Sequence, residues 1–195
     1  DRGLGLCLDP QGNVYVTGTC WGGLVFGALN VYNNSSYTDQ IFVLKLDTNG
    51  NEIWLKNAGV NEPGYPYNDD HGYDLVADNN GDILVTGFVS NNDPWDHFAY
   101  FDAIEVPVPA YDSMAFVAKL SNAGVWQWVK TNGGIESYRD NRITVDDENN
   151  VYVAGGFQET VTFETTTLTS YGLSDIYVTK YSPTGDFLYA VQAGS

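Results

Sequence analysis

The chain has 195 residues, and its 25 Asp and Glu against 8 Lys and Arg give a net charge of −17. Apolar residues make up 43% and aromatic residues 14% of the chain, which is enough for a packed core, so the acidity does not indicate disorder. A surface this negative repels phosphate backbones and anionic lipid, so we expect no nucleic-acid partner. No apolar run approaches the roughly 20 residues that cross a bilayer, so we expect no membrane insertion.

A seven-residue motif occurs three times, at residues 12–18 (GNVYVTG), 81–87 (GDILVTG) and 149–155 (NNVYVAG). An aspartate stands three positions before each copy: Asp9, Asp78 and Asp146. A second motif follows each time, at residues 41–45 (IFVLK), 115–119 (AFVAK) and 176–180 (IYVTK). An aromatic residue then comes nine positions after each lysine: Trp54, Trp128 and Tyr189. Phenylalanines between the two motifs also correspond: Phe26, Phe101 and Phe163. The chain is therefore three copies of one unit.

Each unit is predicted to hold four short strands. The segments are rich in β-branched and aromatic residues and are bounded by Gly, Asn, Asp and Pro, and no segment has a helical period. Tight hairpins join strands one and two and strands three and four, with Gly or Asn at the positions that need positive φ. The segments 47–52 and 78–82 look superficially like calcium loops, but they lack the bidentate Glu at the twelfth position, so we interpret them as turns.

A four-stranded antiparallel unit repeated about every 65 residues is typical of a β-propeller blade. The predicted fold class is all-β, a β-propeller-like array of three four-stranded antiparallel blades. We place blade 1 at residues 1–59, blade 2 at 60–134 and blade 3 at 135–195.

The joint pattern of motif, turn glycine and closing aromatic residue resembles the SBBP repeat, named for its association with seven-bladed β-propellers. The resemblance covers essentially the whole chain, three times over, with departures at Met114, Asn149 and Tyr189. It implies a secreted or cell-surface bacterial protein with a scaffolding or recognition role and without a common catalytic site. The expected localisation is therefore extracellular or at the cell surface.

Closed propellers have typically 4 to 8 blades, so three blades imply further ones. No basic and apolar leader follows Asp1, so we expect a mature product or a piece of a longer chain. The expected partners are further blades or copies of the chain itself, arranged as a ring or as an open fibre. A glycan or a surface protein is a further possible partner.

Two insertions distinguish blade 2 from its neighbours. The spacing from Gly59 to Asp78 exceeds that from Gly133 to Asp146 by six residues, and a second insertion of the same length precedes Phe101. Both should lie on one face, opposite the tight hairpins. They hold both histidines of the chain among our candidate ligand-binding residues: Tyr65, Tyr67, Asp69, Asp70, His71, Asp93, Trp95, Asp96 and His97.

These residue types allow three interpretations. Polar loops can simply close over each other through hydrogen bonds. The aromatic rings can stack on a sugar while Asp and Asn bind its hydroxyls. Histidine and carboxylates can bind zinc, and carboxylates with amide oxygens can bind calcium, but the spacing matches no closed metal motif. We therefore assign no metal residue and expect no cofactor.

No nucleophile elbow, paired-histidine helix or phosphate-binding glycine loop occurs in the sequence. We predict a non-enzymatic extracellular structural or adhesive scaffold. The alternatives are a carbohydrate- or metal-binding module that uses the long-loop face of blade 2, or an acidic glycoside hydrolase, for which no carboxylate pair stands out.

Cys7 and Cys20 are the only cysteines. The predicted hairpin places them roughly 20 Å apart, too far for a disulfide, so we expect buried free thiols. Asn33 and Asn34 begin two overlapping glycosylation sequons.

Overall fold

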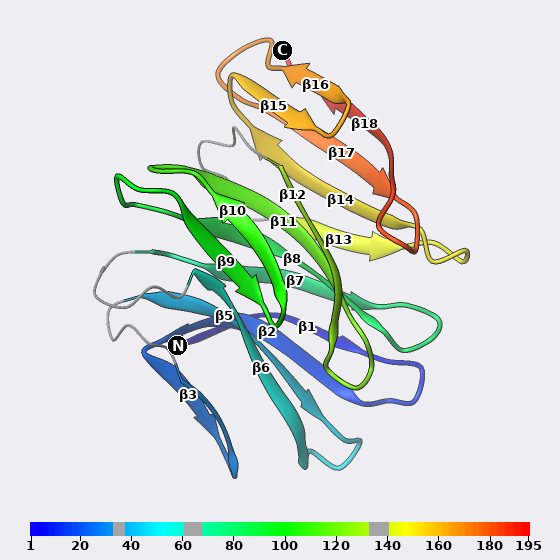
Figure 1. Ribbon diagram of the computed structural model, residues 1–195. Helices are drawn as coiled ribbons and strands as arrows, with labels where there is room; N and C mark the ends of the chain where they lie inside the picture. Colours follow the sequence, from blue (N-terminus) through cyan, green and yellow to red (C-terminus); the bar gives the residue numbers. More distant parts are fainter. Residues whose placement is uncertain (33–37, 61–67, 133–140) are drawn as a thin grey trace.

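The computed structural model describes residues 1–32, 38–60, 68–132 and 141–195, and these form eighteen β-strands (Figure 1). Within this part of the chain no helix is long and apolar enough to cross a membrane. The predicted all-β class is confirmed.

Three groups of four antiparallel strands form the blades. Blade 1 has the order β1 (Arg2–Leu8), β2 (Val14–Trp21), β5 (Asp39–Leu46) and β6 (Glu52–Val60). Blade 2 has the order β7 (His71–Ala77), β8 (Ile83–Ser90), β11 (Ser113–Leu120) and β12 (Trp126–Asn132). Blade 3 has the order β13 (Arg142–Val145), β14 (Val151–Phe157), β17 (Asp175–Tyr181) and β18 (Phe187–Ala193). Each is a meander of the kind found in propeller blades.

Every unit also contains a hairpin between its second and third blade strands, so the prediction of four strands a unit was incomplete. The hairpins are β3 (Gly23–Phe26) with β4 (Leu29–Tyr32), β9 (His97–Phe101) with β10 (Ile104–Val108), and β15 (Thr160–Phe163) with β16 (Thr166–Thr169). Their turns place Gly27, Asp102 and Glu164 at positive φ. Asp and Glu are weak signals for such a turn, which is why the sequence did not reveal these hairpins.

The hairpin of one unit reaches the blade before it. Strand β9 pairs with β6 of blade 1 through Gly59 with Tyr100 and Val60 with Ala99, which makes one sheet of six strands. The hairpin β15–β16 contacts β12 of blade 2 and β18 of its own blade. The hairpins of units 2 and 3 therefore each bridge their own blade and the preceding one, whereas β3 and β4 contact β2 and β6 of their own blade.

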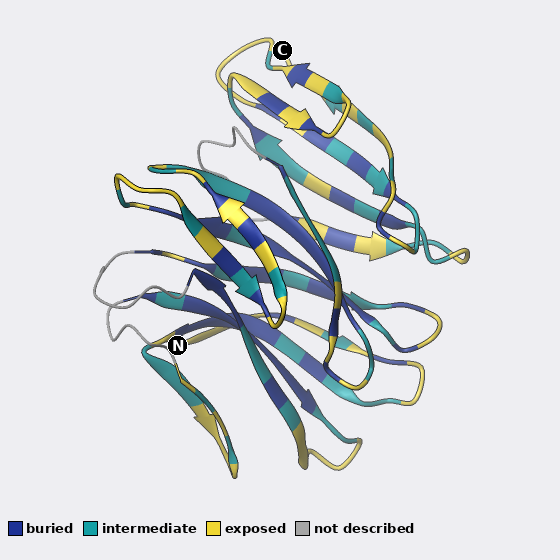
Figure 2. Cartoon of the chain, in the orientation of Figure 1, coloured by how far each residue is buried: buried dark blue, intermediate teal, exposed yellow. Residues whose placement is uncertain are grey.

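The apolar core lies between consecutive blades. The first strands pack in order, β1 on β7 and β7 on β13. One buried cluster joins blades 1 and 2, and a second joins blades 2 and 3. Figure 2 shows buried segments, in dark blue, along strands of all three blades. Each blade thus depends on its neighbours to bury its faces.

The glycine that ends the first repeated motif lies where the backbones of the first and second strands of a blade come close together. A Cβ at Gly18 would overlap the carbonyl group of Arg2 and the ring of Phe42, and a Cβ at Gly87 would overlap the carbonyl group of His71. Only glycine allows the first and second strands to pair at this point.

The repeated aspartates stabilise the turn after the first strand of each blade. One carboxylate oxygen accepts the backbone N–H groups two and four residues further on, at Asp9, Asp78 and Asp146 alike. Partial desolvation opposes ionisation of Asp146, but hydrogen bonds from Asn150 and Tyr152 outweigh it and lower its pKa to about 2. The segment 78–82 is a turn, as interpreted from the sequence.

Both cysteines are free, as expected. Cys20 is buried, whereas Cys7 is only half-buried. Burial raises the pKa of Cys7 to about 12 and that of Cys20 to about 11, so both stay protonated at neutral pH. Asn33 and Asn34 lie outside the described residues.

Candidate functional site

The described parts of the two insertions of blade 2 lie side by side. The Asp69 N–H donates to Ser90 Oγ at 2.8 Å, and the Asn92 N–H donates to Asn68 Oδ1 at 3.1 Å. The candidates Tyr65 and Tyr67 lie outside the described residues. The described parts of the two loops therefore meet through ordinary hydrogen bonds.

Asp70 connects blade 1 to blade 2. Its fully buried carboxylate accepts the Val60 N–H at 2.6 Å and the Ser90 N–H at 2.9 Å, and its carbonyl oxygen accepts the Thr19 hydroxyl at 3.1 Å. Burial raises the pKa of Asp70 well above its usual value, while the two N–H groups act in the opposite direction. Because both carboxylate oxygens of Asp70 accept backbone N–H groups, this candidate residue has a structural role.

The two histidines have different partners. His71 stacks on Phe88 and on Tyr73, with ring centroids 5.0 and 5.7 Å away, and the rings of Tyr73 and Phe88 are themselves 5.7 Å apart. His97 Nε2 lies 3.0 Å from Asp93 Oδ2, and both side chains are largely buried. Among residues 1–32, 38–60, 68–132 and 141–195, no three His, Cys, Asp or Glu side chains are grouped so as to hold a metal ion.

Asn91 organises the second insertion, and sequence reasoning missed it. Its side-chain amide donates to the carbonyl oxygens of Trp95, Val108 and Pro109 at 2.7 to 3.1 Å. Asp96 Oδ1 accepts the Ala110 N–H at 3.0 Å. This framework holds Trp95 with 58% of its surface exposed. Nothing in the sequence distinguishes Asn91 from the other polar residues of the loop.

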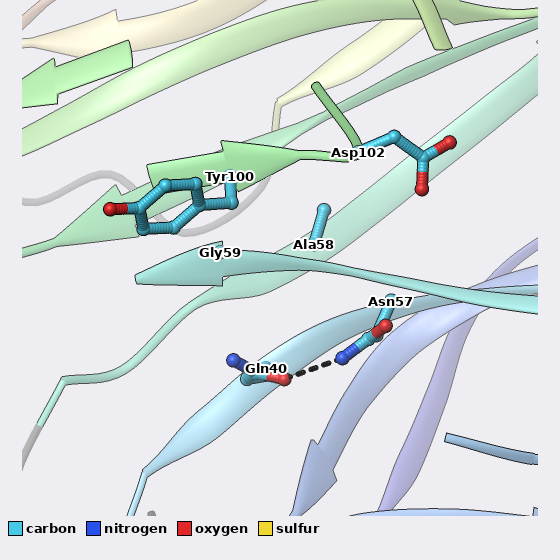
Figure 3. Close-up of a pocket in the computed structure, with 6 residues that line it drawn as sticks. All are labelled: Gln40, Asn57, Ala58, Gly59, Tyr100 and Asp102. Carbon is cyan, nitrogen blue, oxygen red and sulfur yellow. Dashed lines mark hydrogen bonds between the residues drawn. The ribbon is translucent and has the colours of Figure 1, made fainter. Parts of the chain in front are cut away.

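A small pocket lies where the hairpin of blade 2 meets blade 1 (Figure 3). Its volume is about 160 Å³, and it is lined by Gln40, Asn57, Ala58, Gly59, Tyr100 and Asp102. Within it the Asn57 amide donates to Gln40 Oε1 at 2.8 Å. Ordinary ligand pockets measure roughly 300 to 1,000 Å³, so this one is too small for such a ligand.

A repeated contact, here called the blade joint, links the fourth strand of one blade to the next blade. Trp54 of β6 donates its indole N–H to the Asn122 carbonyl oxygen at 3.1 Å, and Trp128 of β12 donates to the Pro183 carbonyl oxygen at 3.3 Å. The rings lie over Gly124 and Gly185, where a Cβ would come within 3.0 and 2.8 Å of the indole. The closing aromatic residue of the repeat is thus a connector between blades.

An ion pair accompanies each blade joint. Lys56 lies 3.4 Å from Asp102, and Lys130 lies 3.0 Å from Glu164. In both cases the lysine comes from a fourth strand and the acid from the hairpin turn of the following unit. These pairs are part-exposed, so each contributes to orientation more than to stability.

Comparison with known proteins supports the blade architecture. No family model matches the chain, so the SBBP assignment stays a prediction. An uncharacterized WD repeat-containing protein of Acanthamoeba polyphaga mimivirus is 24% identical over 176 residues, which cover 83% of this chain and 12% of the viral protein. The chain therefore spans about an eighth of the length of that relative. The likeness and the sheets together indicate a β-propeller-type repeat, and the chain is an all-β protein with propeller-like blades.

Proposed function

We propose that this chain is a non-enzymatic extracellular scaffold of SBBP-type blades, which joins further blades or copies of itself through its blade edges and serves a structural or adhesive role. One observation carries the proposal. Leu6 of blade 1 is 67% exposed, whereas its counterparts Leu75 and Ile143 are 3% and 8% exposed because the preceding blade covers them. An exposed apolar face that is buried elsewhere in the same molecule favours an interaction surface.

The acidic side chains favour a scaffold over a glycoside hydrolase. Asp9, Asp47, Asp78 and Asp146 each use a carboxylate oxygen to accept turn N–H groups. Asp70 is buried with both oxygens engaged. Hydrogen-bonded turn carboxylates of this kind are held by the backbone instead of facing a substrate.

Sedimentation velocity over a range of concentrations tests assembly. We expect species larger than the 21.4 kDa chain, growing with concentration. A single 21.4 kDa species at every concentration contradicts assembly. Antibody labelling of intact, unpermeabilised source cells tests the extracellular assignment, and labelling only after permeabilisation contradicts it.

A second candidate function is glycan recognition by the second insertion. It is favoured by Trp95, an exposed ring held by the Asn91 framework next to Asp93 and Asp96. Aromatic rings of this kind can stack on sugars. A glycan array tests this function. Trp95→Ala should abolish binding of the protein to the glycans, whereas Tyr171→Ala, which alters another exposed ring, should leave binding unchanged.

A further inference from the structure

A buried lysine of blade 1 meets a side-chain amide of blade 2. Lys45 of β5 is 4% exposed, and its Nζ lies 2.6 Å from Oδ1 and 3.1 Å from the backbone carbonyl oxygen of Asn122. Asn122 lies in the turn between β11 and β12, 77 positions away along the chain. A primary amine is thus held within hydrogen-bond distance of a carboxamide, whose carbonyl carbon is an electrophile.

The side-chain amide of Asn122 is held in one orientation. Its Nδ2 donates to Asp9 Oδ2 at 3.3 Å, to the Tyr15 hydroxyl at 3.2 Å and to the Gly81 carbonyl oxygen at 3.1 Å. Because three acceptors surround the nitrogen, Oδ1 faces the lysine. The amine therefore lies on the carbonyl side of the amide, and the acceptors lie around the amide nitrogen.

The surroundings of Lys45 favour its neutral, nucleophilic form. Burial lowers the pKa of Lys45 below its usual value, although the charge of Asp9 acts in the opposite direction. Nζ lies 5.2 Å from the centre of the Tyr15 ring, which packs edge-on against the ring of Trp54. A lysine amine that is desolvated in this way is an activated nucleophile.

A carboxylate stands beside the amide nitrogen of Asn122. Partial desolvation opposes ionisation of Asp9, but hydrogen bonds from Asn13 and Tyr15 lower its pKa, so it is charged at neutral pH. The Tyr15 hydroxyl donates to Asp9 Oδ2 at 3.1 Å. A carboxylate within hydrogen-bond distance of a reacting nitrogen can act as general base and then as general acid.

We propose that Lys45 and Asn122 form an intramolecular isopeptide bond, which joins blade 1 to blade 2 covalently. The neutral Nζ of Lys45 attacks Cγ of Asn122, so a C–N bond forms and the carbonyl electron pair moves to Oδ1. One proton passes from Nζ to Nδ2, carried by Asp9. The carbonyl group then re-forms, the Cγ–Nδ2 bond breaks, and Nδ2 leaves as ammonia. Nothing is oxidised or reduced, and the fixed position of amine and amide replaces a collision between them.

The corresponding lysines of the other blades have different neighbours. Lys119 Nζ lies 2.8 Å from Asp78 Oδ2, and the counterpart of Asn122 in the following blade is Pro183, which has no side-chain amide. Lys180 Nζ lies 3.4 Å from Asp146 Oδ2. Blade 3 therefore supplies matched controls for the lysine and for the aspartate of the proposed reaction.

The isopeptide bond goes beyond the proposed function and does not rest on it, because it forms within one chain. It closes a loop between residues 45 and 122, which restricts the unfolded chain and keeps blades 1 and 2 together. The bond is therefore expected whether or not the chain assembles.

Mass spectrometry of the intact, denatured chain tests the proposal. After incubation at mildly alkaline pH until its mass is constant, the parent should be lighter than its sequence mass by one ammonia molecule. Protease digestion should yield a branched peptide that contains both Lys45 and Asn122. Lys45→Arg keeps the positive charge but has no primary amine, so it should keep its full sequence mass. Lys180→Arg should lose ammonia as the parent does.

Asp9→Asn tests the proton carrier. The variant keeps a side-chain oxygen for the turn N–H groups of Gln11 and Asn13 but has no carboxylate. Its release of ammonia should be at least about tenfold slower than that of the parent. Asp146→Asn makes the same change in blade 3 and should react at the parent's rate. Circular dichroism checks that each variant folds.

Three results would overturn the isopeptide bond. The first is a parent chain that keeps its full sequence mass. The second is a loss of ammonia that persists in a folded Lys45→Arg, because the ammonia would then come from another asparagine, such as Asn49 or Asn80, each of which precedes a glycine. The third is recovery of Lys45 and Asn122 of the parent in separate linear peptides, a result that decides the matter even if Lys45→Arg does not fold.

Discussion

The indole N–H of Trp54 in blade 1 donates to the carbonyl oxygen of Asn122 in blade 2, with 3.1 Å between Nε1 and O. The side chain of Asn122 continues the connection, because its amide donates to Asp9 Oδ2 and to the Tyr15 hydroxyl of blade 1. Lys45 Nζ lies 2.6 Å from Asn122 Oδ1. A turn of one blade is thus held by the fourth strand and the first turn of its neighbour.

Trp54→Phe should weaken the first blade joint. The change keeps an aromatic ring but removes the indole donor, and the loss of one such hydrogen bond lowers the free energy of unfolding by about 1 kcal/mol. Urea denaturation followed by circular dichroism measures the change. Trp21→Phe alters another ring, 52% exposed, and should stay close to the parent. Equal losses in both variants would contradict the role of the indole N–H.

Gly124→Ala should cost more stability than Gly50→Ala. Both glycines lie at positive φ, 79° and 82°, so both substitutions carry a backbone strain of about 1 kcal/mol. Only at Gly124 does the new methyl group meet an indole ring, 3.0 Å from Trp54 Cδ2, which adds roughly 1 to 3 kcal/mol of overpacking. Thermal unfolding of the two variants isolates this difference. Equal melting temperatures would show that Trp54 does not press on Gly124.

Lys119→Met should be strongly destabilising. Lys119 Nζ lies 2.8 Å from Asp78 Oδ2, and both residues are buried. Removing the ammonium group leaves a buried carboxylate without its counter-ion, which costs roughly 3 to 5 kcal/mol. Lys56→Met breaks the part-exposed pair with Asp102 and should cost less than about 1 kcal/mol. Chemical denaturation of both variants checks the prediction, and similar losses would refute it.

Asp70 should make stability fall as pH rises. Its folded-state pKa lies above the ordinary value of 3.8, so the folded chain holds this proton more tightly than the unfolded chain does. Its stabilising contribution is therefore complete below about pH 3.8 and is lost as pH rises through the folded pKa. The turn aspartates Asp9, Asp47 and Asp146 have lowered pKa values, so their contribution to stability is lost only as the pH falls below about 4, outside the range of the Asp70 effect.

Asp70→Asn provides the comparison for this pH dependence. The variant has no carboxyl group to titrate, so the difference in unfolding free energy between it and the parent should change progressively above about pH 4, over the range in which Asp70 titrates in the folded chain. Urea melts across this range measure the difference, and a constant offset between parent and Asp70→Asn would contradict the raised pKa.

The candidate site could be predicted only in part. Sequence comparison within the chain located the two insertions of blade 2, and the structure shows that their described parts meet through Ser90 and Asn92. Sequence comparison could not reveal that Asp70 is buried and connects blade 1 to blade 2. A carboxylate is buried when backbone N–H groups from other strands reach it, and those of Val60 and Ser90 come from two different blades.

The sequence by itself determined the repeat, the all-β class and the aspartate turns, because alternating apolar residues and turn residues act over a few neighbouring positions. Tertiary structure alone decided how the blades connect. Nothing in the sequence distinguishes Trp54 and Trp128, as connectors between blades, from ordinary core residues. The hairpin whose turn holds Asp102 was likewise not predicted, and its contact with Lys56 is known only from the structure. Contacts between blades depend on side chains far apart along the chain, so local patterns cannot specify them.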